Sequence, residues 1–196
     1  MWFIDGIVAK GSYALVAGGP FTGKTQLQLQ WLAASDRGEP FLGIPPVPNL
    51  SWVLVSLDKT LQSCERSLIR AGHDPSKVDI AALGGVGRLD WKQDLVTGWK
   101  DKLTGEIHPP IVQPQHKLVI IETIPFYATD HTKKRAARAF LSPFVGWLQK
   151  TGRGCWGSGH EPKHLKANET DPWQRFEGSH YWTGGECESI ISIWKP

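Results

Sequence analysis

Short apolar runs alternate with helical patterns along the chain. The apolar runs of strand type lie at 12–17, 52–57, 118–124 and 189–194. The helical patterns lie near 24–35, 60–71, 93–103 and 134–150. This alternation predicts an α/β fold in which a mainly parallel, twisted sheet carries helices on both faces. A further buried strand is expected near 153–160, although that stretch, "RGCWGSGH", is rich in glycine and poor in β-branched residues.

Length and composition favour one globular domain that spans residues 1–196. The chain of 196 residues is long enough to bury a sizeable core, and the Pro/Gly-rich stretches 38–50 and 104–115 are too short to separate domains. No apolar run is long enough to span a membrane, and Asp5 interrupts the N-terminus early, which argues against a signal peptide. The three cysteines form no CxxC pair and favour reduced thiols. We therefore expect a soluble, cytoplasmic protein.

A glycine-rich loop separates the first strand from the first helix. Its sequence, "GGPFTGKT", carries Gly18, Gly23, Lys24 and Thr25 at the spacing of a phosphate-binding loop. In such a loop the backbone N–H groups face the phosphates, the lysine reaches the β- and γ-phosphates, and the hydroxyl binds Mg²⁺. The nucleotide-binding candidates are Gly18, Gly19, Pro20, Phe21, Thr22, Gly23, Lys24, Thr25 and Gln26.

Two acidic residues follow predicted strands. Asp58 closes "WVLVSLD" and Glu122 closes "KLVIIE". In a parallel sheet both would point to the edge where ligands gather, next to the phosphate-binding loop. Phosphoryl transfer to water needs a carboxylate that supports Mg²⁺ and a second group that polarises the water, so both residues are catalytic candidates. Each could instead cap the helix that follows it.

Taken together, these stretches resemble the RecA-like P-loop ATPases, and within them the group around the plasmid replicative helicase RepA. The resemblance runs from "WFIDGIVAKGSYALVAGGPFTGKTQLQLQ" through "LVIIETIPFY" to "GHEPK" and "EGS". It implies that Asp58 takes the place of the glutamate that activates water, that Glu122 takes the place of the Walker B aspartate and helps Thr25 to hold Mg²⁺, and that His160 senses the γ-phosphate.

The chain also departs from that family pattern. The two carboxylate positions carry the opposite acids, with Asp at 58 and Glu at 122. Shortening a general base by one methylene misplaces its oxygen, which can cost on the order of a hundredfold in rate, so hydrolysis is expected to be slow. Lys163 follows the sensor position, and Arg175 lies near the place of an arginine finger. Both are candidates for contacts to a neighbouring subunit.

Basic and aromatic residues gather in the two regions that contact DNA in RecA-like proteins. These candidates are Lys133, Lys134, Arg135, Arg138, Lys163, Lys166, Trp173 and Arg175. Cations contact the phosphate backbone, and aromatic rings give the bases a stacking surface. The pattern favours single-stranded DNA as a partner, although a basic run can equally be a solvated helix face.

The expected function is that of an ATP- and Mg²⁺-dependent motor of replication, recombination or repair, of the helicase or recombinase type. The resemblance implies a homo-oligomeric ring or filament, with partner proteins supplying further functions. One alternative is a DNA-binding switch with little ATP turnover. A second is a zinc peptidase, because His160, Glu161 and His164 match His-Glu-x-x-His. Pro162 and the preceding glycines argue against the continuous helix that this zinc site requires.

Overall fold

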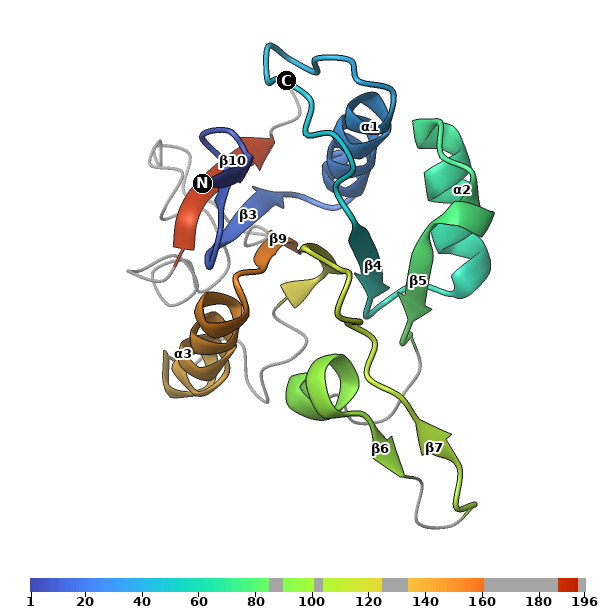
Figure 1. The fold of residues 1–196 in the computed structure, drawn as a ribbon, viewed down its shortest axis with the longest axis vertical. Helices are drawn as coiled ribbons and strands as arrows, with labels where there is room; N and C mark the ends of the chain where they lie inside the picture. The colour runs from blue at the N-terminus through green and yellow to red at the C-terminus, as the bar shows by residue number, and fades with distance from the viewer. Residues whose placement is uncertain (85–89, 101–103, 125–133, 161–186, 194–196) are drawn as a thin grey trace.

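The computed structural model describes residues 1–84, 90–100, 104–124, 134–160 and 187–193 (Figure 1). Its main sheet has six strands in the order β10-β3-β9-β8-β4-β5, and every neighbouring pair is parallel. The strands are β3 (Tyr13–Gly18), β4 (Trp52–Ser56), β5 (Asp79–Ala82), β8 (Leu118–Glu122), β9 (Gly154–His160) and β10 (Cys187–Ile193). The predicted α/β fold with a mainly parallel sheet is confirmed.

Helices cover both faces of this sheet. Helices α1 (Lys24–Asp36) and α2 (Leu61–Ala71) pack on one face, and α3 (Lys134–Thr151) packs on the other (Figure 1). Successive side chains of a strand point to opposite faces, and strand β3 shows this directly. Its Leu15 joins the core under α3, whereas its Ala14 and Val16 join the core under α1 and α2. Because both faces are covered, β3, β4 and β8 are buried along their whole lengths.

The glycine-rich strand expected near 153–160 is present as β9, and it lies between β3 and β8. Glycine is required at 157 by close packing rather than by an unusual backbone angle. A Cβ atom there would lie 2.0 Å from Ile124 Cδ1 and 2.6 Å from Ile124 Cγ1. The missing side chain therefore makes room for Ile124, which is fully buried just beyond the end of β8.

The structure corrects the prediction of a helix at 93–103. A short π-helix, η2 (Lys92–Thr97), is followed at once by strand β6 (Trp99–Lys100), because Gly98 adopts a φ of 66° that ends the helix. β6 pairs antiparallel with β7 (Ile107–His108), which lies inside a stretch expected to be a loop, and the two strands project from the main sheet (Figure 1).

Three further short elements were not predicted from the sequence. They are β1 (Trp2–Ile4) and β2 (Val8–Ala9), which pair antiparallel, and the 3-10 helix η1 (Pro75–Lys77). The edge strand β5 was also missed.

Across the described ranges, no helix combines the length and the apolar character needed to cross a membrane.

Replacing Gly157 by alanine is expected to destabilise the protein. The added methyl group would collide with the buried Ile124 side chain, and overpacking of this kind costs about 1–3 kcal/mol. The free energy of unfolding, measured by urea denaturation, should fall by that amount. Gly146→Ala is the matched control, since a Cβ at that exposed position of α3 meets nothing within 4 Å. That control should be neutral or stabilising. Equal stability of Gly157→Ala and the parent protein would show that the β8–β9 packing is not tight.

Candidate nucleotide site

The carboxyl ends of the central strands converge on a cleft of about 480 Å³. Its lining combines the loop after β3, the residues that follow β4 and β8, and part of β9. The residues are Pro20, Phe21, Thr22, Gly23, Lys24, Thr25, Gln26, Asp58, Lys59, Ser67, Arg70, Glu122, Thr123 and Ser158. The structure thus brings most of the predicted loop and both predicted acids to one cavity, at the edge where parallel sheets bind ligands.

The phosphate-binding loop has the conformation that its glycines allow. Gly23 has a φ of 90°, and helix α1 begins directly after it. The first helical hydrogen bond runs from Leu27 N–H to Gly23 O at 2.8 Å, so residues 24–26 form the N-terminal end of the helix beside the cleft. Backbone N–H groups and the positive end of the helix dipole favour an anion there.

Lys24 holds the loop together. Its ammonium donates hydrogen bonds to Gly18 O and Gly19 O, each at 2.8 Å, and the side chain lines the cleft although the residue is 8 % exposed. Thr22 closes the same turn by donating its hydroxyl to Gly19 O at 2.9 Å. An anion in the cleft would offer Lys24 a charged acceptor in place of two neutral carbonyls, which makes the lysine a suitable phosphate ligand.

Three side chains from three elements meet beside the loop. Thr25 donates its hydroxyl to Glu122 Oε1. Lys59 Nζ lies 2.7 Å from the same carboxylate oxygen and 3.3 Å from Thr25 Oγ1. Strands β4 and β8 run parallel, and Ser56 pairs with Glu122. Lys59, three positions after Ser56, therefore reaches the end of β8.

The Glu122 carboxylate is buried, with the residue only 2 % exposed. Burial raises the pKa of Glu122, while the nearby Lys59 ammonium opposes that rise. The second carboxylate oxygen, Oε2, is buried and has no hydrogen-bond partner among the described residues. A hydroxyl and a carboxylate are oxygen ligands of the kind that Mg²⁺ prefers, so Thr25 and Glu122 fit the predicted magnesium site.

Asp58 lies on the exposed side of the cleft. Within the described ranges its carboxylate accepts a hydrogen bond from the hydroxyl of Ser56, at 3.5 Å to Oδ1, which is a long and weak contact. The two predicted acids therefore have different environments, one buried beside a lysine and one open to solvent. The buried acid beside Thr25 is the one placed to hold a cation.

The remaining predicted residues are only partly described. His160 ends β9 in register with Gly18, next to the phosphate-binding loop, but its side chain is not among the described groups. Because His160 belongs to a strand, the zinc-peptidase pattern does not start in a helix, and Glu161 and His164 lie outside the described residues. No cluster of three or more metal-binding side chains occurs in the described part of the chain.

The predicted DNA contacts are described least. Arg138 is exposed on α3, and Lys134 and Arg135 begin that helix, with side chains that are not described. The other DNA and subunit candidates fall outside the described residues; they are Lys133, Lys163, Lys166, Trp173 and Arg175.

Sequence reasoning missed five residues that line the cleft: Lys59, Ser67, Arg70, Thr123 and Ser158. Of these, Lys59 contacts both Thr25 and Glu122. A lysine after a strand is usually a solvated side chain, so its type gave no signal. Its position did give one, because it directly follows Asp58 at the strand end where ligands were expected.

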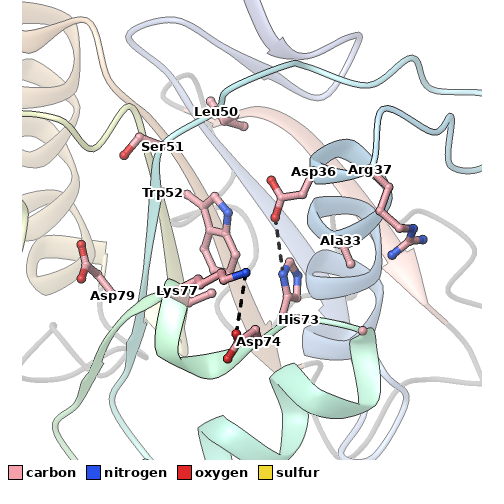
Figure 2. A pocket seen from close by; sticks show the side chains of 12 residues that line it. Ala33, Asp36, Arg37, Leu50, Ser51, Trp52, His73, Asp74, Lys77 and Asp79 are labelled. Atoms are coloured by element: carbon pink, nitrogen blue, oxygen red, sulfur yellow. Dashed lines mark ion pairs between the residues drawn. The ribbon is translucent and has the colours of Figure 1, made fainter.

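A second cavity, of about 410 Å³, lies at the opposite ends of the same elements (Figure 2). It lies between the end of α1, the start of β4 and the η1 region. His73 pairs with Asp36 at 3.5 Å, shares a hydrogen bond with Leu29 O at 2.8 Å and packs against Trp52, and Lys77 pairs with Asp74 at 3.9 Å (Figure 2). The contacts of His73 tie the end of α2 to α1.

Comparisons with known proteins agree with this fold. The sequence profile of the AAA domain family matches residues 1–164. Among solved structures, the chain is similar to a KaiC-like protein from the hyperthermophilic archaeon Pyrococcus horikoshii OT3, with a TM-score of 0.52 and 19 % identity over 94 % of this chain and 73 % of that one. At this identity the likeness shows the fold alone. No curated protein matches the sequence.

The profile match covers most of the chain, and its span includes the phosphate-binding loop, Asp58, Lys59 and Glu122. The family match indicates a nucleotide-binding ATPase. The chain therefore belongs to the AAA domain family, and its fold is that of a RecA-like P-loop ATPase.

Proposed function

We propose that the cleft binds ATP with Mg²⁺ and hydrolyses the ATP slowly. We also propose that the protein uses this hydrolysis to act on single-stranded DNA. The observation that carries the proposal is the convergence of Lys24, Thr25, Asp58 and Glu122 on one cavity beside the N-terminus of α1. This combination supplies an anion site, a cation site and a candidate base, which are the three parts that phosphoryl transfer to water requires.

Each residue has a role that follows from its surroundings. Lys24 exchanges its two carbonyl acceptors for the phosphates, and the N-terminus of α1 receives their negative charge. Thr25 and Glu122 would hold the Mg²⁺, which would offset charge on the phosphates. Asp58, open to solvent, orients the attacking water and accepts its proton.

The DNA part of the proposal depends on the basic run that includes Lys133, Lys134 and Arg135, together with the exposed Arg138 on α3. It also depends on the resemblance to helicase-type RecA-like proteins. We further propose that copies of the chain assemble so that Arg175 and Lys163 of one copy complete the site of the next, as the family pattern implies.

A second candidate function is a nucleotide-controlled switch with negligible turnover. The exchange of the two acids favours it, because a shorter side chain at 58 holds a general base farther from its target.

Lys24→Ala should abolish ATP binding while the fold is retained. The variant loses the cation that reaches the phosphates, together with two hydrogen bonds from a charged donor, of about 1.5–3 kcal/mol each. Isothermal titration with ATP and Mg²⁺ measures the affinity, and circular dichroism monitors the fold. An ATP affinity equal to that of the parent protein would show that the loop is not the nucleotide site.

Asp58→Glu should raise steady-state ATP turnover by roughly tenfold to a hundredfold, because the added methylene returns the carboxylate to the reach that the family uses. Asp58→Asn should reduce turnover to the level of Lys24→Ala without loss of ATP binding. Asp74→Glu makes the same chemical change at the second cavity and should leave turnover unaltered. If neither substitution at 58 changes turnover, Asp58 is not the base and the switch function is favoured.

Changing Lys133, Lys134 and Arg135 together to alanine should weaken binding of a labelled single-stranded oligonucleotide. The slope of log affinity against log salt should also become shallower, by about 1 for each cation that no longer touches a phosphate. The control removes three exposed cations elsewhere, as Arg66, Lys77 and Lys92 to alanine. An unchanged salt slope in the first variant would identify the run as a solvated helix face.

A further inference from the structure

The Lys59 ammonium contacts the same two side-chain oxygens that fit Mg²⁺. The oxygens that fit Mg²⁺ are Thr25 Oγ1 and the Glu122 carboxylate, and Lys59 Nζ already lies 3.3 Å from the first and 2.7 Å from the second. We propose that Lys59 is a built-in substitute for Mg²⁺, which neutralises Glu122 in the nucleotide-free protein and has to withdraw when the metal binds. This inference rests on the proposed nucleotide site.

The buried carboxylate is stabilised by a neighbouring cation. Glu122 is buried at the end of β8, and removing a charge from water is costly unless an opposite charge replaces the lost solvation. Among the described residues, Lys59 is the cation that forms an ion pair with it, and the lysine side chain is 30 % exposed. The pair therefore neutralises the buried carboxylate with the chain's own charge.

The lysine is also able to leave. Its ammonium is carried by a flexible chain of four carbons and reaches Glu122 from the loop after β4. The side chain is partly exposed to solvent in the cleft. Glu122, by contrast, is fixed at the end of a buried strand. Displacement of the ammonium moves one flexible side chain and leaves the sheet unchanged.

Two consequences follow for metal dependence. Mg²⁺ has to compete with a tethered ammonium, so the protein should require more Mg²⁺ than it would with a neutral side chain at 59. When Mg²⁺ is absent, the same ammonium stays in the cleft as a positive charge beside Thr25. It should then support nucleotide binding without metal.

The test compares the parent protein with Lys59→Met, which keeps most of the length of the side chain and removes its charge. Binding of an ATP analogue with a fluorescent methylanthraniloyl group is titrated in Mg²⁺ and in EDTA. The parent protein should lose less than about tenfold in affinity in EDTA, because an ammonium replaces the metal. Lys59→Met should lose at least about a hundredfold, and its half-saturating Mg²⁺ concentration should fall by about tenfold.

A thermal melt adds a readout that needs no nucleotide. Without Lys59, Glu122 is buried without its counter-ion, so Mg²⁺ alone should raise the melting temperature of Lys59→Met more than that of the parent protein. Lys59→Arg keeps the charge and should behave like the parent. Lys77→Met removes one positive charge at the second cavity, where the lysine side chain is 81 % exposed, and should also behave like the parent.

The outcomes separate the two proposals. If the parent protein binds the analogue in neither condition, the nucleotide site itself is wrong and the role of Lys59 falls with it. If the parent protein binds the analogue but loses about a hundredfold or more in EDTA, Lys59 does not stand in for the metal. The affinity of the parent protein in EDTA tests the role of Lys59 even if Lys59→Met fails to fold. Equal Mg²⁺ dependence in the parent and a folded Lys59→Met would also overturn the inference.

Discussion

The buried carboxylate of Glu122 is the constraint on which the site depends. A charge at the end of a buried strand has to be matched by a cation, and the chain meets that need with Lys59 from the loop after the neighbouring strand β4. The parallel register of β4 and β8 brings the two residues together, so the sheet that forms the core also builds the ion pair. The hydroxyl of Thr25 then joins the phosphate-binding loop to the same oxygen.

The order of the strands sets a second condition. Thr25 follows β3 and Glu122 ends β8, yet β9 lies between these strands. Neighbouring strands are about 4.8 Å apart, so the site has to span two such spacings at the edge of the sheet. Gly157 in β9 leaves the space that Ile124 fills, two residues after Glu122. The end of β8 can therefore pack closely against β9. The glycine content that made this strand hard to recognise is thus part of what positions the acid.

Sequence patterns predicted the long elements and the loop because each has a local cause. The buried runs of β3, β4 and β8 are continuous and apolar, and Gly23 and Lys24 stand at fixed offsets before a helix. The π-helix η2 and the hairpin of β6 and β7 were missed because their form depends on Gly98 and on pairing across a loop, which local periodicity does not report. Lys59 was missed for a similar reason, since its role comes from a partner 63 positions along the chain.

In the structure, both lysines of the cleft are bonded to groups of the chain itself, Lys24 to two carbonyls and Lys59 to Glu122. Ligand binding would exchange these internal partners for phosphate and metal. A crystal structure of the protein with Mg²⁺ and a non-hydrolysable ATP analogue tests this most directly. It should show the phosphates within the loop of residues 18–25, with Lys24 Nζ moved from Gly18 O and Gly19 O onto them and Lys59 Nζ away from Glu122. An analogue bound elsewhere, with both lysines still on their present partners, would contradict the assignment of the cleft as the nucleotide site.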